Sequence, residues 1–152
     1  MTRILMVCLG NICRSPLAEG ILRSKLPKSY FKVDSAGTSG FHRGSPPDPR
    51  SIVVSKLNGI DISNQRSRPF SGYDFEIFDH IFVMDQSNYN DVIKQAKSEA
   101  ERQKVSLILD YPNAEINEVP DPYYGGDQGF EHVFDLLDKA CTYHSKNLTQ
   151  QS

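Results

Sequence analysis

The stretch of sequence that decides the fold is Ile4-Leu5-Met6-Val7-Cys8-Leu9-Gly10-Asn11-Ile12-Cys13-Arg14-Ser15-Pro16. Its first part, Ile4–Cys8, is an unbroken apolar run of the kind that forms a strand covered on both faces. Gly10 and Asn11 both tolerate left-handed backbone angles, so they predict a tight turn after that strand. Ser15 then suits a helix N-cap, and Pro16 suits the first helical position. The stretch therefore predicts a strand, a tight turn and the start of a helix.

The rest of the chain repeats this alternation of strand and helix patterns. Three more apolar runs, Phe31–Asp34, Ile81–Met84 and Val105–Leu109, predict strands. Apolar residues also recur at helical spacing in four stripes. These are Leu17, Ile21, Leu22 and Leu26; Ile52, Val53 and Leu57; Val92, Ile93, Ala96 and Ala100; and Phe130, Val133, Phe134, Leu137, Ala140 and Cys141. The alternation predicts one α/β domain over residues 1–152, with a doubly wound four-stranded parallel sheet and helices on both faces.

Length and composition exclude several other classes of protein. The chain has 152 residues, of which 38% are hydrophobic and 24% charged, as in a globular protein rather than a disordered one. Its net charge of −2 excludes a broadly basic nucleic-acid binder. The apolar run Ile4–Leu9 is shorter than the roughly 18 residues of a membrane span, and too short for a secretory signal. With 3 cysteines there is no disulfide scaffold, so we expect a cytoplasmic protein without nucleic-acid or membrane partners.

The loop after the first strand has the properties of an anion site. In a doubly wound fold the ligand lies beyond the carboxyl ends of the strands, where the strand order reverses. Inward-pointing loop amides and a helix N-terminus bind anions, and Arg14 adds a planar fork of donors that fits phosphate. Cys8 lies at the other lip of the loop, and a thiol near an arginine and a helix N-terminus ionises readily to the nucleophilic thiolate. The spacing lets Cys8 and Arg14 face one phosphate, which predicts phosphoryl transfer.

Cys8, Arg14 and Ser15 form a Cys-x5-Arg-Ser motif near the N-terminus. The further motifs are DSAGTSG at Asp34–Gly40, PPDPR at Pro46–Arg50, FDHIFVMD at Phe78–Asp85 and DPYYG at Asp121–Gly125. With these motifs the sequence resembles the low-molecular-weight protein-tyrosine phosphatases over nearly its whole length. The resemblance implies a four-stranded parallel sheet and hydrolysis of phosphotyrosine through a phosphocysteine intermediate. It also implies phosphotyrosine-containing proteins as partners, and it implies neither a cofactor nor a metal ion.

The resemblance also assigns catalytic roles. Cys8 is implied to be the nucleophile, and Arg14 to bind the phosphate together with the loop. The other residues of this phosphate-binding loop are Leu9, Gly10, Asn11, Ile12, Cys13 and Ser15. The general acid has two candidates, Asp48 and Asp121, which both precede proline, and composition and spacing do not choose between them. The match to the DPYY motif selects Asp121 and leaves Asp48 with a structural role.

Two sets of residues are implied to support the loop. Asn11, Ser35 and Asn64 match a polar network that holds the loop in shape, although the family often has histidine where this chain has Asn64. The Ser15 hydroxyl is implied to hydrogen-bond the cysteine sulfur. Cys13 is either a redox partner that forms a disulfide with Cys8, as in relatives with this pair, or a small residue packed under the loop.

Aromatic residues are implied to surround the pocket mouth. Phe41, Tyr123 and Tyr124 match positions that sandwich the substrate ring, and a deep aromatic slot favours phosphotyrosine over the shorter phosphoserine. His42 and Arg43 are either contacts for acidic residues of a protein substrate or a solvated surface pair. The sequence leaves the oligomeric state open.

Three other functions are compatible with parts of this pattern. A protein-arginine phosphatase of the same family has threonine where this chain has Ile12, so Ile12 favours a tyrosine ester. A thioredoxin-coupled arsenate reductase of the same fold needs two more cysteines after the third strand, and Met84–Ala100 contains none. A module that only binds phosphotyrosine would lack Cys8, Arg14 or Asp121, and all three are present. The sequence therefore favours a tyrosine phosphatase.

Overall fold

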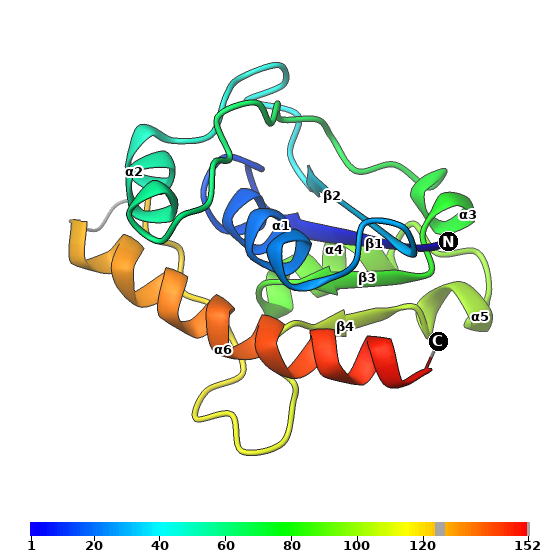
Figure 1. The fold of residues 1–152 in the computed structure, drawn as a ribbon. Coiled ribbons are helices and arrows are strands. Elements are labelled where there is room, and N and C mark those ends of the chain that lie inside the picture. Colours follow the sequence, from blue (N-terminus) through cyan, green and yellow to red (C-terminus); the bar gives the residue numbers. More distant parts are fainter. Residues whose placement is uncertain (124–126, 152) are drawn as a thin grey trace.

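The chain folds around a four-stranded parallel sheet (Figure 1). The structure, a computed structural model, describes residues 1–123 and 127–151. The strands are β1 (Thr2–Cys8), β2 (Phe31–Gly37), β3 (His80–Val83) and β4 (Val105–Leu107), in the spatial order β2-β1-β3-β4. Every neighbouring pair of strands is parallel, so the predicted parallel sheet is confirmed.

The strand order reverses beside β1. The chain runs from β1 outward to β2 and then returns to the other side of β1 for β3 and β4. In this arrangement the loops that leave the carboxyl ends of β1 and β3 diverge and open a crevice in which ligands bind. Cys8 is the last residue of β1 and therefore lies at this crevice.

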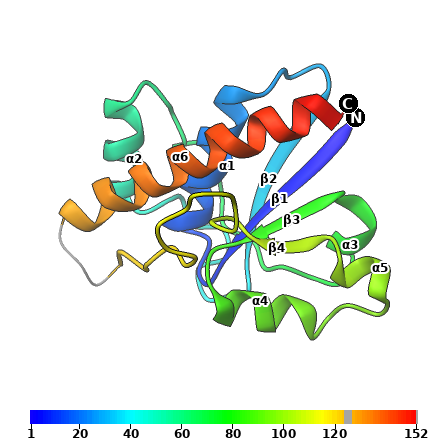
Figure 2. The same ribbon diagram turned by 90° about the horizontal axis from the view of Figure 1, so that it is seen from below.

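Helices cover both faces of the sheet. They are α1 (Arg14–Lys25), α2 (Pro49–Leu57), α3 (Asp74–Ile77), α4 (Gln86–Ile93), α5 (Glu99–Arg102) and α6 (Asp127–Gln151). Figure 2 shows α1, α2 and α6 on one side of the sheet and α3, α4 and α5 on the other, as the prediction of two covered faces requires. Among the described residues, no helix combines the length and hydrophobicity needed to cross a membrane.

The alternation of side chains along β1 explains its unbroken apolar run. Ile4, Met6 and Cys8 belong to the hydrophobic cluster shared with α1 and α6. Leu5 and Val7 point to the opposite face and belong to a second cluster. Because successive strand residues alternate between faces, a central strand between two helical layers must be apolar throughout.

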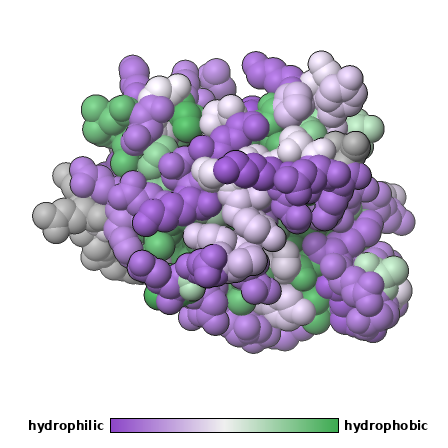
Figure 3. Space-filling view, turned by 60° about the horizontal axis from the view of Figure 1, so that its bottom comes forward, coloured by the Kyte–Doolittle hydropathy of each residue, from purple (hydrophilic) through white to green (hydrophobic). Residues whose placement is uncertain are grey.

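One face of the molecule (Figure 3) shows how the surface contrasts with these two clusters. The face in Figure 3 is largely hydrophilic, and hydrophobic residues reach it only in separate small areas. Such scattered exposure is normal for a folded protein and does not by itself indicate a binding surface.

The predicted N-cap at Ser15 is wrong. Helix α1 begins at Arg14 with Cys13 at the N-cap position, and no side chain caps it. The Ser15 hydroxyl instead contacts the sulfur of Cys8 at 3.1 Å, so it is not available to the helix backbone. The predicted turn does use a left-handed residue, because Asn11 has a φ of 56°, but Gly10 does not have a positive φ.

The apolar stripe predicted for the second helix is wrong for two of its three residues, although the helix is present and Ile52 packs against the core. Val53 is 58% exposed and Leu57 is 78% exposed. Helix α2 instead buries Val54 together with two small serines, Ser51 and Ser55. A short helix that packs through serines has too weak a hydrophobic pattern for its buried face to be predicted.

The third predicted helix is interrupted. Helix α4 ends at Ile93, a turn follows at Lys94 and Gln95, and Ala96 lies outside any helix. A separate helix, α5, begins after Ser98, whose hydroxyl accepts a hydrogen bond from the Glu101 backbone N–H at 3.1 Å. Serine at this position is a strong helix start signal, and here it outweighs the continuous apolar spacing.

Candidate active site

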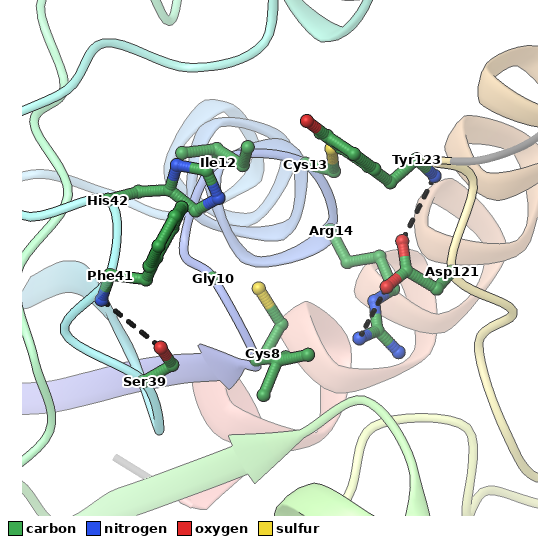
Figure 4. Close-up of a pocket in the computed structure, with 11 residues that line it drawn as sticks. Cys8, Gly10, Ile12, Cys13, Arg14, Ser39, Phe41, His42, Asp121 and Tyr123 are labelled. Carbon is green, nitrogen blue, oxygen red and sulfur yellow. Dashed lines mark hydrogen bonds and ion pairs between the residues drawn. The ribbon is translucent and has the colours of Figure 1, made fainter.

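A pocket of about 350 Å³ opens at the carboxyl end of β1 (Figure 4). It is lined by Cys8, Leu9, Gly10, Ile12, Cys13, Arg14, Ser39, Phe41, His42, Asp121 and Tyr123. The residues come from the loop between β1 and α1, from the segment after β2 and from the loop before α6. The structure thus brings Cys8, Arg14 and Asp121 into one pocket at the reversal of strand order.

The loop between Cys8 and Arg14 directs hydrogen-bond donors toward the cysteine sulfur. The Asn11 backbone N–H donates to Cys8 Sγ at 3.3 Å, and Ser15 Oγ lies 3.1 Å from the same sulfur. Cys8 is buried at the base of the pocket. These contacts hold the sulfur in a fixed position at the carboxyl end of β1.

Asn11 fixes the direction of these hydrogen bonds. Its side-chain Oδ1 accepts from the Arg68 backbone N–H at 3.1 Å, so its Nδ2 must face the two serines. Nδ2 donates to Ser15 Oγ at 2.7 Å and to Ser35 Oγ at 3.0 Å. Because the Ser15 oxygen accepts from Asn11, its own hydrogen is free to point at Cys8 Sγ.

The segment after β2 holds the outer side of the loop. The Thr38 and Ser39 backbone N–H groups donate to the carbonyl oxygens of Cys8 and Leu9, each at 2.9 Å. Gly37 makes this approach possible, because a Cβ at that position would lie 2.8 Å from the Leu9 carbonyl oxygen. The DSAGTSG motif therefore has a steric role beside the loop.

The sequence analysis missed Glu19, which extends this network. The Ser35 hydroxyl donates to Glu19 Oε1 at 2.7 Å, and Arg23 Nη2 contacts Glu19 Oε2 at 2.6 Å. Burial raises the pKa of Glu19 to about 7, although the hydrogen bond from Ser35 and the charge of Arg23 oppose the increase. A charged residue within the first helical stripe was the available signal, since glutamate is rarely buried unless it is paired.

The prediction that Asn64 belongs to this network is not supported by the geometry. Asn64 is exposed and lines a separate polar hollow beside Glu19. Within the described residues its side chain makes no hydrogen bond to Asn11, Ser35 or Glu19. The second carboxylate oxygen of Glu19 pairs with Arg23 instead, so the network does not need a donor from position 64.

Arg14 is held rigidly on one side of the pocket. Its Nη1 donates to Asp85 Oδ2 at 2.7 Å and to the Val119 carbonyl oxygen at 3.1 Å, and the residue is 3% exposed. Burial acts to lower the pKa of Arg14, but the negative charges of Cys8 and Asp85 outweigh it and raise the pKa. A permanently charged guanidinium in a fixed orientation suits the binding of a phosphate.

Asp85 is the second functional residue that the sequence analysis missed. It follows β3, and its Oδ1 accepts from the Asn88 backbone N–H at 2.8 Å, which caps α4. The same carboxylate orients Arg14 through its other oxygen. The signal was its place in the loop after Met84, one of the loops at the carboxyl edge of the sheet.

Asp121 lies beside Arg14 at the rim of the pocket (Figure 4). Its Oδ2 is 3.6 Å from Arg14 Nη2, and its Oδ1 accepts from the Tyr123 backbone N–H at 3.0 Å. The side chain is 39% exposed, so it can reach both solvent and a molecule in the pocket. This position suits an acid that exchanges protons during a reaction.

Asp48, the other candidate acid, lies outside the pocket lining. Its carboxylate accepts hydrogen bonds from the backbone and side chain of Arg50. Burial acts to raise the pKa of Asp48, but the hydrogen bonds and charge of Arg50 outweigh it and hold the pKa below its usual value. The geometry therefore agrees with the structural role expected for Asp48.

Aromatic rings flank the mouth of the pocket. The Tyr123 and His42 rings are 6.4 Å apart between centroids, and the Phe41 ring packs edge-on against His42 at 5.0 Å. Phe41 is 87% exposed, so most of its surface is available for contact. Tyr124, the third predicted wall residue, lies outside the described residues.

The three cysteines differ in environment, and all are free thiols. Cys13 lines the pocket, but burial, followed by the negative charges of Asp48 and Cys8, raises its pKa to about 12. Cys141 is fully buried in α6 with its sulfur near the Ala18 carbonyl oxygen. Of the three, Cys8 is the one whose sulfur lies 3.1 Å from the Ser15 hydroxyl and accepts the Asn11 backbone N–H.

Residues 1–123 and 127–151 contain no group of three or more histidine, cysteine, aspartate or glutamate side chains that could hold a metal ion. The pocket combines the sulfur of Cys8, the guanidinium of Arg14 and the carboxylate of Asp121. A Cys-x5-Arg loop at the end of the first parallel strand, with a carboxylate at its rim, defines a class of phosphatases.

Comparison with known proteins places the chain within this class. Residues 3–152 match the family model described as low molecular weight phosphotyrosine protein phosphatase, and the chain belongs to that family. The low molecular weight phosphotyrosine protein phosphatase of Schizosaccharomyces pombe is 43% identical over 134 residues, which cover 84% of this chain and 85% of that protein.

Two solved structures have the same fold. The crystal structure of a protein tyrosine phosphatase from Entamoeba histolytica, with Hepes in its active site, is 38% identical and has a TM-score of 0.94 over 99% of both chains. Wzb of Vibrio vulnificus, solved with benzylphosphonate, is 31% identical and has a TM-score of 0.87 over 96% of this chain and 98% of that one.

Proposed function

We propose that this chain, acting as one domain in the cytoplasm, hydrolyses phosphotyrosine in proteins and that Cys8 is the nucleophile. The observation that carries the proposal is the convergence on one sulfur of the Asn11 backbone N–H and the Ser15 hydroxyl, 3.3 and 3.1 Å away. Arg14 and Asp121 lie in the same pocket. A reducing compartment fits this mechanism, because an oxidised Cys8 could not attack phosphorus.

In the first step the Cys8 thiolate attacks phosphorus and the bond from phosphorus to the tyrosine oxygen breaks. Loop amides and Arg14 Nη2 bind the equatorial oxygens, where negative charge accumulates in the transition state. Asp121, in its protonated form, gives its proton to the leaving phenolate. This step requires Arg14 Nη2 to exchange its 3.6 Å contact with Asp121 for the phosphate.

In the second step water attacks the phosphocysteine. Asp121, now a carboxylate, takes a proton from the water, and inorganic phosphate forms as the bond from phosphorus to sulfur breaks. The departing sulfur receives the hydrogen bond of Ser15, whose orientation Asn11 sets through its 2.7 Å bond. The cycle ends with the thiolate and the protonated Asp121 restored.

Phosphotyrosine is the substrate class that the pocket supports best. Phe41, His42 and Tyr123 lie at its mouth, where rings can pack against a phenyl group. The related Wzb structure holds benzylphosphonate, an aromatic phosphate analogue. Phosphoarginine is less favoured, because the apolar Ile12 lines this pocket. Arsenate reduction is less favoured, because the third thiol, Cys141, is fully buried.

The test compares hydrolysis of matched phosphotyrosine, phosphoserine and phosphoarginine peptides by the unaltered chain, Cys8→Ser and Asp121→Asn. We expect hydrolysis of phosphotyrosine only, none by Cys8→Ser, and ~10²–10⁴-fold slower turnover by Asp121→Asn. Cys8→Ser should still bind the phosphotyrosine peptide. Full activity in Cys8→Ser would disprove the covalent mechanism, and a preference for phosphoarginine would disprove the substrate class.

A further inference from the structure

Arg50 belongs to the PPDPR motif, to which the proposed reaction assigns no part. Its guanidinium binds the Asp48 carboxylate in a bidentate manner: Nε donates to Oδ1 at 3.1 Å and Nη2 donates to Oδ2 at 3.0 Å. The Asp48 backbone N–H donates to the Ile12 carbonyl oxygen at 2.8 Å. Through Asp48, Arg50 is therefore tied to the phosphate-binding loop.

The other contacts of Arg50 reach the loop that carries Asp121. Its Nη2 donates to the Tyr123 carbonyl oxygen at 3.0 Å, and the guanidinium carbon lies 5.8 Å from the centre of the Tyr123 ring. It also lies 4.5 Å from the centre of the Phe130 ring in α6. Arg50 is the second residue of α2, and Figures 1 and 2 show this helix next to the first turns of α6.

Tyr123 connects these contacts to the acid. Its carbonyl oxygen accepts from Arg50, while its backbone N–H donates to Asp121 Oδ1 at 3.0 Å. Asp121 lies in a loop, outside any helix or strand, and its side chain is 39% exposed. Without an anchor, such a side chain would sample many positions and only rarely face the leaving oxygen.

We propose that Arg50 is a positioning residue that holds the Asp121 loop at a fixed distance from the phosphate-binding loop. The proposal rests on the phosphatase function above. The planar guanidinium suits the role, because it can hydrogen-bond a carboxylate and a carbonyl oxygen while its faces contact aromatic rings. Lysine in its place would keep the charge but lose the bidentate hydrogen bonds to Asp48.

A positioning role predicts a specific kinetic pattern. The acid matters most when the leaving group is a poor one, because a stable phenolate departs without a proton. Displacing Asp121 should therefore slow the hydrolysis of phenyl phosphate strongly and that of 4-nitrophenyl phosphate weakly. A general loss of folded enzyme would slow both substrates equally, so the ratio of the two kcat/KM values separates the two effects.

The experiment measures that ratio for the unaltered chain, Arg50→Met, Arg50→Lys and the control Arg102→Met. Arg102 lies on α5 and pairs only with Glu99 among the described residues, at the opposite end of the molecule from α2 (Figure 1). For Arg50→Met we expect a ~10–100-fold loss on phenyl phosphate and less than a ~3-fold loss on 4-nitrophenyl phosphate. For Arg50→Lys we expect a loss on phenyl phosphate that is smaller than that of Arg50→Met. The kcat/KM values of Arg102→Met should match those of the unaltered chain.

A double variant makes the test stricter. If Arg50 acts through Asp121, then Arg50→Met added to Asp121→Asn should cost less than a ~2-fold further loss on phenyl phosphate. Equal losses on both substrates, or full additivity in the double variant, would overturn the role of Arg50 and leave the phosphatase function intact. No turnover of either substrate by the unaltered chain would overturn both.

Discussion

The Ser15 hydroxyl serves two partners at once, and this makes its removal informative. It accepts from Asn11 Nδ2 at 2.7 Å and lies 3.1 Å from Cys8 Sγ. In Ser15→Ala the sulfur loses a hydroxyl donor, so both the attacking thiolate and the departing sulfur are less stable. We expect kcat to fall ~10–100-fold, as measured by steady-state hydrolysis of 4-nitrophenyl phosphate.

Ser24→Ala is the matched control for this change. Ser24 lies on the same helix, but its hydroxyl donates to the Ile21 carbonyl oxygen at 2.6 Å, and Ser24 is not among the residues that line the pocket. We expect its kcat to equal that of the unaltered chain. Equal kcat values for Ser15→Ala and Ser24→Ala would show that the hydroxyl near the sulfur has no catalytic effect.

Glu19 makes the stability of the protein depend on pH. Burial raises its pKa from 4.5 to about 7, so the folded chain holds a proton that the unfolded chain releases. This group therefore stabilises the fold fully below the unfolded pKa, and the contribution is lost as pH rises through the folded pKa. In Glu19→Gln the side chain is neutral at every pH. The decrease in the free energy of unfolding between low and high pH should therefore be smaller than in the unaltered chain, by up to ~3 kcal/mol.

Urea unfolding of both proteins at about pH 5 and about pH 8 measures this difference. Subtracting the two profiles removes the contribution of all other titrating groups. Parallel profiles would mean that Glu19 stays ionised in the folded protein and that Arg23, which contacts it at 2.6 Å, compensates its burial completely.

At the scale of elements, the end of β3 is what holds Arg14 in place. Asp85 follows that strand, caps α4 with one oxygen and binds Arg14 Nη1 with the other, at 2.7 Å. In Asp85→Asn the cap is retained, but the charge that orients Arg14 is lost. We expect kcat/KM to fall ~10–100-fold, with a loss of ~1–3 kcal/mol in stability by urea unfolding.

Ser98→Ala provides the comparison, since Ser98 caps α5 and is not among the residues that line the pocket. It should lose ~1 kcal/mol of stability and no activity. If Asp85→Asn behaved in the same way, Asp85 would be a helix cap only.

Elements could be predicted where one physical pattern dominates. The four apolar runs predicted the strands, most clearly β1 and β3, whose alternating side chains belong to the clusters on both faces of the sheet. Helix boundaries were less predictable, because a single hydrogen bond decides them. Ser98 starts a new helix within an apolar stripe, whereas Ser15 does not cap because its hydroxyl contacts Cys8.

The pocket residues divide in a similar way. Cys8 and Arg14 could be predicted to face one anion because both lie in the loop after the first strand, whereas only the match to the DPYY motif selected Asp121 over Asp48. Glu19 and Asp85 lie at positions that the patterns indicated, a helical stripe and a loop at the same edge of the sheet, but their roles come from contacts with Ser35 and Arg14 that cross the fold. Spacing along one sequence does not contain that information.

At the scale of the whole molecule, the pocket joins segments that are far apart in the chain. The loop after β1, the segment after β2, the end of β3 and the loop of Asp121 all meet there. Strand order predicts such a meeting point, since ligands bind where the order reverses. An anion bound there would contact several of these segments and should stabilise the whole fold.

Inorganic phosphate should therefore raise the thermal unfolding temperature. At a concentration about 100 times its Kd, a ligand of the folded state adds ~2.7 kcal/mol of stability, which is a rise of ~5–10 °C for a chain of this size. The measurement compares phosphate with sodium chloride at equal ionic strength, for the unaltered chain and for Arg14→Met. Because phosphate also stabilises proteins by exclusion from their surface, only a rise that Arg14→Met abolishes identifies the pocket. An equal rise in both proteins would mean that the pocket does not bind the anion, and the proposed reaction would lose its first requirement.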